Sequence, residues 1–123
     1  MIDSSLVILY VNNPEASARF YADLLGKQPV EASPTFAMFV LPSGMKLGLW
    51  SRHTVEPAST GTPGYGEIVF SAGSDEQVNS LYSLWKEKGL DIAQPPVALD
   101  FGYTFVARDP DGHRLRVYRL SQE

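Results

Sequence analysis

The sequence contains no cysteine, which excludes disulfide bonds, thiolate catalysis and metal sites with cysteine ligands. It also lacks any apolar run of membrane-spanning length, and its polar start at residues 2–5 is unlike a signal peptide. The net charge of -4 shows no basic excess, which argues against nucleic acid or an anionic membrane as a partner. These absences predict a soluble cytoplasmic protein.

A chain of 123 residues is long enough for one compact domain, or for two small modules that share a core. Its composition, with 44% hydrophobic and 20% charged residues, is that of an ordinary globular protein. Strand and helix signals occur together in both halves of the chain. They predict a single α+β domain over residues 1–123.

The first half begins with an apolar, β-branched run and continues with a helix signal. Leu6–Val11 is typical of a buried strand. Asn13 is placed to cap a helix that has Pro14 at its first position and Gly26 at its end. Three shorter strands are predicted after this helix, over residues 28–32, 36–41 and 45–50. This half is interpreted as one βαβββ module, over about residues 1–50.

The same order of signals returns after residues 51–65, a segment rich in proline, glycine, serine and threonine that is predicted to be a linker. Glu67–Ser71 is a strand candidate, and Ser74 opens a helix with Gln77 three residues later, as in a capping box. Aligning the two halves places Glu67 over Leu6 without a shift. Residues 66–123 are therefore predicted to be a second βαβββ module.

The later strands of the second half carry two signals. Residues 90–94 form a short strand candidate, which Pro95 and Pro96 bar from a central position, and a loop is predicted over residues 97–100. Asp109–His113 then reads as the tight turn of a hairpin, because proline and glycine suit its positions. Alternation along the outgoing strand places Arg114, Arg116 and Tyr118 on one face. Such a face is unusual for a strand inside a domain and points to function.

The duplicated unit, the Phe20–Tyr21 pair in the first helix and the Asp-Pro-Asp-Gly hairpin resemble the vicinal oxygen chelate superfamily. This superfamily holds glyoxalases, extradiol dioxygenases and the bleomycin and fosfomycin resistance proteins. The resemblance implies a glyoxalase/bleomycin resistance-like fold in which the two modules form a shared cleft. Leu47–Trp50, Thr104–Phe105 and Asp109–His113 most closely resemble the phenazine-binding antibiotic resistance proteins, which are binders and not catalysts.

Enzymes of this superfamily place metal ligands on the first and last strands of each module. The resemblance puts these positions at Leu6, Gly48, Glu67 and Arg116, of which only Glu67 offers a carboxylate. The guanidinium of Arg116 would repel a metal ion. The resemblance therefore implies that the metal has been lost and that no cofactor is bound. Glu67 and Arg116 are expected to form an ion pair in its place, because neither charge is easily buried alone.

Trp50 is the main candidate for ligand binding. Alternation from the turn at Gly44 puts it on the face of the family's cleft together with Gly48, whose missing side chain would leave room beside the indole. The alternative is that Trp50 fills core at the end of its strand. Phe101 and Tyr103, a second aromatic pair in the loop that enters the last hairpin, are further candidates, with a hydrophobic lid over the sheet edge as their alternative role. The full set of predicted ligand contacts is Phe36, Met38, Gly48, Trp50, Glu67, Phe101, Tyr103, Arg116 and Tyr118.

The sequence thus predicts a metal-independent homodimer that sequesters a flat aromatic small molecule, with or without a carboxylate, for antibiotic resistance or self-protection. No catalytic residue is predicted. One alternative is a glyoxalase-like lyase or a dioxygenase that uses Glu67, Glu31 or His53 as unexpected metal ligands. Another is a dimeric module for protein contact, whose cleft is filled by its own side chains.

Overall fold

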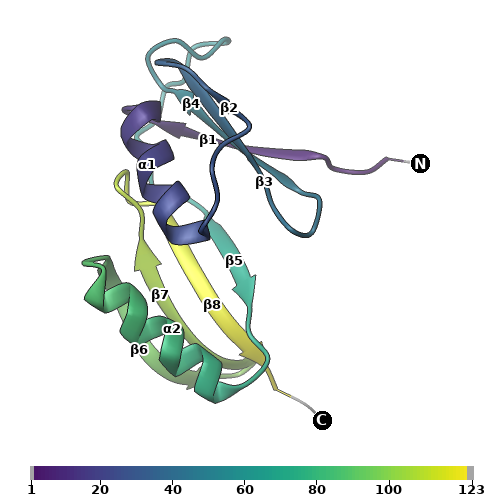
Figure 1. The fold of residues 1–123 in the computed structure, drawn as a ribbon, viewed down its shortest axis with the longest axis vertical. Coiled ribbons are helices and arrows are strands. Elements are labelled where there is room, and N and C mark those ends of the chain that lie inside the picture. The colour runs from purple at the N-terminus through teal and green to yellow at the C-terminus, as the bar shows by residue number, and fades with distance from the viewer. Residues whose placement is uncertain (1, 122–123) are drawn as a thin grey trace. The chain divides into compact units, whose positions relative to one another are not determined.

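The computed structural model describes residues 2–121, which divide into two compact units on either side of the Pro63–Gly64 bond (Figure 1). Each unit contains one helix and four strands, in the predicted order. The first unit holds β1 (Leu6–Val11), α1 (Pro14–Leu25), β2 (Glu31–Ala32), β3 (Phe36–Val40) and β4 (Lys46–Ser51). The second holds β5 (Glu67–Ser71), α2 (Asp75–Glu87), β6 (Asp91–Leu99), β7 (Gly102–Arg108) and β8 (Arg114–Leu120).

The sheet of the first unit has the strand order β1-β4-β3-β2, in which β1 runs parallel to β4 and the other pairs are antiparallel. The helix α1 begins as predicted, because the side chain of Asn13 accepts a hydrogen bond from the Ala16 N–H at 3.1 Å. Tyr21 of the helix is fully buried, as are Phe39 and Leu49 of the sheet. One face of the sheet is thus packed against α1 and the other is left open.

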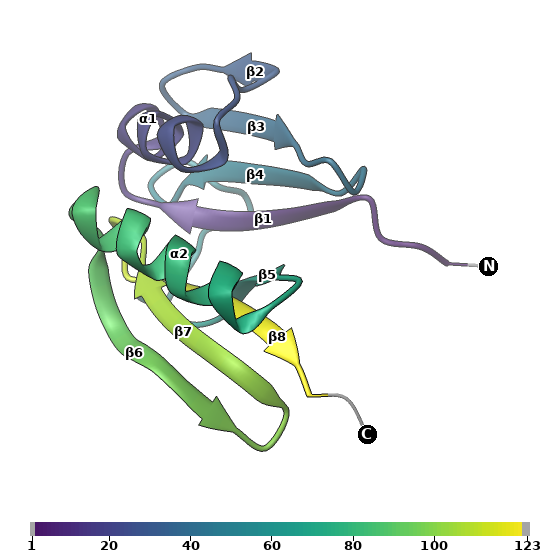
Figure 2. The same cartoon turned by 60° about the horizontal axis from the view of Figure 1, so that its bottom comes forward.

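The sheet of the second unit has the equivalent order, β5-β8-β7-β6, with β5 parallel to β8. The predicted duplication of a βαβββ unit is therefore confirmed. In Figure 2 the helix α2 lies along one face of this sheet. Trp85 of the helix packs edge to face against Phe70 and Phe105, with ring centroids 5.9 and 5.3 Å apart. These aromatic contacts form the core of the unit.

The strand β6 is longer than predicted. It continues through Pro95 and Pro96 to Leu99, so the prediction of a strand ending at residue 94 and a loop over 97–100 is wrong. The prolines are tolerated because β6 lies at the edge of the sheet, as predicted, and an edge strand needs partners on one side only. Irregular register on either side of Gln94 absorbs the residues that cannot pair.

Two smaller expectations also differ from the structure. The strand β2 covers Glu31–Ala32 and not residues 28–32, since Pro29 has no N–H to donate to a ladder. The side chain of Gln77 accepts from the N–H of Gly73 at 2.6 Å, one residue before the Ser74 cap. Ser74 itself accepts from the Gln77 N–H at 3.1 Å, so the cap is present although the reciprocal bond of a capping box is displaced.

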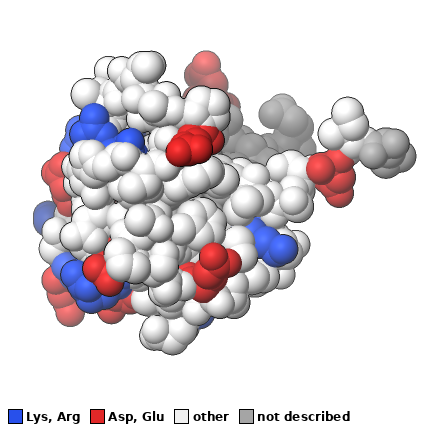
Figure 3. All heavy atoms as spheres, turned by 90° about the horizontal axis from the view of Figure 1, so that it is seen from above, with Lys and Arg blue, Asp and Glu red and all other residues white. Residues whose placement is uncertain are grey.

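One face of the molecule shows how its charged side chains are distributed (Figure 3). On the face shown in Figure 3, acidic and basic side chains are scattered and do not gather into a patch of one sign. No helix among residues 2–121 is long and apolar enough to cross a membrane. Residues 52–66 contain neither helix nor strand, as predicted for the linker, although Val55 within them is buried.

Candidate functional site

The open face of the second sheet is built around Arg116 on β8. Alternation directs this side chain away from Leu115 and Val117, both of which are fully buried. Its Nε donates to Oε1 of Glu67 at 2.8 Å, and its Nη2 donates to Oε2 at 3.0 Å. The predicted ion pair is therefore confirmed, as a two-point contact between the neighbouring parallel strands β5 and β8.

This pairing shifts the ionisation of both residues in the direction of the charged forms. The hydrogen bond from Arg116 lowers the pKa of Glu67 below its ordinary value of 4.5, although partial burial opposes the shift, and the positive charges of Arg116 and Arg114 add to the lowering. The same hydrogen bond raises the pKa of Arg116. Arg114 approaches Glu67 to 3.8 Å from the solvent side. The carboxylate is thus ionised at neutral pH and faces two guanidinium groups.

The residues at the positions where the resemblance implies metal ligands do not fit a divalent ion. Leu6 and Gly48 offer no donor side chain, and both oxygens of Glu67 accept hydrogen bonds from Arg116. Throughout residues 2–121 no three histidine, aspartate or glutamate side chains gather closely enough to hold a metal ion. Glu31 and His53, the other ligands considered, are exposed side chains on β2 and in the linker.

Aromatic side chains lie beside the ion pair. The ring of Phe101 stands 5.8 Å from Cζ of Arg116, within the range of a cation–π contact. Phe101 also meets Tyr118 edge to face, with ring centroids 6.2 Å apart. Phe101 keeps 39% of its surface exposed, so the cluster presents aromatic surface to solvent next to a guanidinium.

Tyr103 does not join this cluster. Its hydroxyl donates to Oδ1 of Asn79 on α2 at 2.8 Å, which places it on the helix-covered face of the sheet. The sequence treated Phe101 and Tyr103 as a pair in a loop, but Phe101 lies in the turn before β7 and Tyr103 lies within the strand. Thr104 contacts Arg116, and neighbouring residues of a strand face opposite sides. Tyr103 must therefore face α2.

Four of the predicted ligand contacts lie in the first unit and share the open face of its sheet. They are Phe36, Met38, Gly48 and Trp50. Phe36 pairs with Trp50 across β3 and β4, and Met38 pairs with Gly48. The rings of Phe36 and Trp50 meet edge to face, with centroids 6.1 Å apart. Tyr10 is the neighbour of Trp50 on β1 and is 42% exposed. This face is apolar and aromatic, and the register confirms that the candidates lie side by side.

Gly48 does not leave the open slot that the sequence predicted. A side-chain carbon at this position would lie 3.1 Å from Cζ of Phe36 and 3.3 Å from Cγ1 of Ile8. The space beside Gly48 is therefore filled by neighbouring side chains, because the ring of Phe36 lies over the glycine backbone. Glycine at this position leaves space for the ring of Phe36, which meets Trp50 edge to face.

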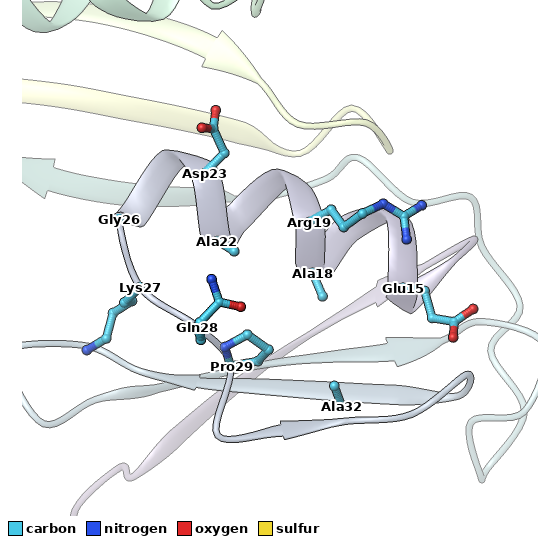
Figure 4. Close-up of a pocket in the computed structure, with 10 residues that line it drawn as sticks. All are labelled: Glu15, Ala18, Arg19, Ala22, Asp23, Gly26, Lys27, Gln28, Pro29 and Ala32. Atoms are coloured by element: carbon cyan, nitrogen blue, oxygen red, sulfur yellow. The ribbon is translucent and has the colours of Figure 1, made fainter.

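A groove of about 820 Å³ lies elsewhere in the first unit, beside α1 (Figure 4). Ala18 and Ala22 point from the helix toward β2 and the loop before it, whereas Asp23 points away. The Nζ of Lys27 donates to the carbonyl of Val40. None of the predicted ligand contacts lines this groove, and its full lining is Glu15, Ala18, Arg19, Ala22, Asp23, Gly26, Lys27, Gln28, Pro29 and Ala32.

Comparisons with known proteins agree with this fold. Residues 4–117 match the family described as the Glyoxalase/Bleomycin resistance protein/Dioxygenase superfamily. The phenazine antibiotic resistance protein EhpR of Enterobacter agglomerans is 32% identical over 122 residues, which cover 97% of this chain and 93% of that protein.

Solved structures give the same result. Protein ATC0852 of Agrobacterium tumefaciens is 52% identical, with a TM-score of 0.87 over 99% of this chain and 100% of that chain. A glyoxalase/bleomycin resistance protein/dioxygenase from Nocardioides shares the fold at 22% identity, with a TM-score of 0.84 over 99% of this chain and 85% of that chain. The chain belongs to the glyoxalase/bleomycin resistance protein/dioxygenase superfamily.

Proposed function

We propose that this protein binds a flat aromatic small molecule without a metal, and that it protects its host by sequestering that molecule. The observation that carries the proposal is the two-point ion pair of Glu67 and Arg116, which stands where enzymes of the family need metal ligands. The family includes resistance proteins, and a relative with 32% identity is named for resistance to a phenazine antibiotic. A ligand built on fused aromatic rings agrees with both facts.

The open sheet faces supply the chemistry that such a ligand needs. A guanidinium has five N–H donors. Three of those of Arg116 are engaged by Glu67 and Thr104, which leaves one on Nη1 and one on Nη2 for an acceptor or a carboxylate of the ligand. The nearby ring of Phe101 offers a stacking surface. Trp50 offers another in the first unit. The homodimer and the cytoplasmic location stay predictions of the sequence.

The first expected result is ligand-induced stabilisation of metal-free protein. Phenazine-1-carboxylate should raise the melting temperature by several degrees, because a ligand present at about 100 times its Kd adds roughly 2.7 kcal/mol to the free energy of unfolding. Elemental analysis of the same sample, purified without a metal-binding tag, should show no stoichiometric divalent metal. Adamantane carboxylate, which carries the charge but no flat ring, is the matched control and should leave the melting temperature unchanged.

Two outcomes would contradict the proposal. One is a stoichiometric divalent ion whose removal abolishes binding, which would favour a lyase or dioxygenase with unusual ligands. The other is the absence of any shift across phenazines and aromatic antibiotics. That result would favour a module whose open faces are filled by its own side chains or by a second protein.

A further inference from the structure

Thr104 is a buried polar residue in the centre of the second sheet, and the sequence did not identify it as part of the site. It lies on β7, is fully buried, and pairs with Tyr118 on β8. Its hydroxyl donates to the carbonyl of Val117 at 2.8 Å and accepts from Nη1 of Arg116 at 3.3 Å. Because a hydroxyl has one hydrogen, the bond to Val117 leaves only lone pairs for the guanidinium.

A purely structural role does not account for this arrangement. The residues that follow Thr104 along β7 are Phe105, Val106 and Ala107, which are all buried and apolar. Valine has nearly the same shape as threonine and would fill the site without a polar group to desolvate. The bond to Val117 satisfies the hydroxyl by itself. Valine would lose both hydrogen bonds, and of the two only the contact with Arg116 reaches a residue of the proposed binding face.

We propose that Thr104 is a positioning residue that fixes the guanidinium of Arg116, so that the face selects aromatic ligands carrying a hydrogen-bond acceptor. The inference rests on the proposed function. Glu67 holds Nε and Nη2 from one edge, and Thr104 holds Nη1 from another. Contacts on two edges fix the guanidinium plane beside Phe101. The two remaining N–H groups then point in set directions before a ligand arrives, which lowers the entropy lost on binding.

The test compares two ligands that differ only in the acceptor, phenazine-1-carboxylate and unsubstituted phenazine. Their affinities are measured for the wild type, Thr104→Val and Thr104→Ser. Thr104→Val should weaken the carboxylate about tenfold, the scale of one lost hydrogen bond, and change phenazine by less than about twofold. Thr104→Ser keeps the hydroxyl and should restore the preference. An unchanged ratio of affinities in Thr104→Val, or an equal loss for both ligands, would overturn the proposal.

A second measurement needs no ligand. In ¹⁵N-labelled protein, NMR signals of the Arg116 guanidinium report rotation about its C–N bonds. The wild type and Thr104→Ser should show hindered rotation and distinct Nη signals, whereas Thr104→Val should show averaging. Identical signals in all three proteins would refute positioning by Thr104 even if both ligands bind. If the wild type binds neither these two ligands nor any other phenazine or aromatic antibiotic, the proposed function fails and ligand selection fails with it. The NMR measurement still decides whether Thr104 holds the guanidinium.

Discussion

Replacing Gly102 with alanine is expected to lower the free energy of unfolding of the second unit by about 3 kcal/mol or more. Gly102 opens β7 directly after the turn, with a φ of 149° that favours glycine. An added side-chain carbon would lie 1.9 Å from the carbonyl oxygen of Arg119. The backbone of β8 would have to move away from β7, and this strand carries Arg116. Urea unfolding followed by tryptophan fluorescence measures the loss.

Gly44→Ala is the matched control for this substitution. Gly44 has a φ of 93°, and a side-chain carbon there would meet no atom within 4 Å. Its replacement should therefore lower the free energy of unfolding only by the cost of placing an alanine at a positive φ, on the order of 1 kcal/mol. Equal losses in the two variants would show that the close approach of Gly102 to Arg119 does not exist in solution.

The second large effect is expected on binding. Trp50→Ala should weaken phenazine-1-carboxylate by roughly 1–3 kcal/mol, the range for stacking on an aromatic side chain. Trp50 stands edge to face against Phe36 on the open face of the first sheet. Its removal deletes ring surface without disturbing the side of the sheet that packs on α1. Isothermal titration calorimetry measures the change.

Trp85→Ala provides the contrast in stability. Trp85 is buried between Phe70 and Phe105, so its truncation should cost about 3–5 kcal/mol of the free energy of unfolding. Trp50→Ala should cost less. If Trp50→Ala unfolds the protein, and the folded fraction still binds with unchanged affinity, Trp50 belongs to the core and the proposed contact is wrong.

The ion pair allows a further test through pH. A double-mutant cycle of Glu67→Gln and Arg116→Met should give a coupling energy of about 1–2 kcal/mol at pH 7, between the values typical of exposed and buried pairs. The pKa of Glu67 is lowered in the folded state. The coupling should therefore be complete above pH 4.5 and disappear as the pH falls through the lower, folded-state pKa. Urea unfolding across pH 7 to 3 measures it.

The pair formed by Arg108 and Asp91 serves as the control for this cycle. Their contact is 2.9 Å long but involves one nitrogen and one oxygen, with side chains 38% and 70% exposed. Its coupling energy should stay within about 0.5 kcal/mol. A Glu67 coupling that is no larger, or that persists unchanged at pH 3, would mean that the two-point contact does not hold in solution.

Local signals in the sequence were sufficient for most of the fold. The cap at Asn13, the strand Glu67–Ser71 and the alternation along β8 each depend on neighbouring residues, and the structure confirms them. The length of β6 was not predictable in the same way. Two adjacent prolines normally end a strand, and only the position of β6 at the edge of the sheet allows it to continue.

Contacts of the site were predictable from the sequence where pairing of opposite charges or alternation along a strand determined them. An arginine and a glutamate on neighbouring strands had to pair, whereas the use of the space over Gly48 depended on how Phe36 turns its ring. Tyr103 was wrongly placed among the ligand contacts. It lies within β7 and not in a loop, and alternation along that strand turns its side chain toward α2. Thr104 appeared in the sequence only as part of a motif that resembles the phenazine-binding proteins, and its contact with Arg116 could not be predicted from a threonine in a strand.

The separation of Glu67 and Arg116 along the chain has a consequence for the order of folding. They are 49 residues apart and lie on the first and last strands of the second unit. Closing a loop of this length must precede their contact, so parallel pairing of β5 with β8 belongs to the slow, non-local part of folding. A chain still in synthesis, or cut before β8, cannot assemble the ion pair. If the proposed ligand contacts Arg116, only a molecule whose β8 has paired with β5 can offer the complete contact, and bound ligand would then oppose the separation of these two strands.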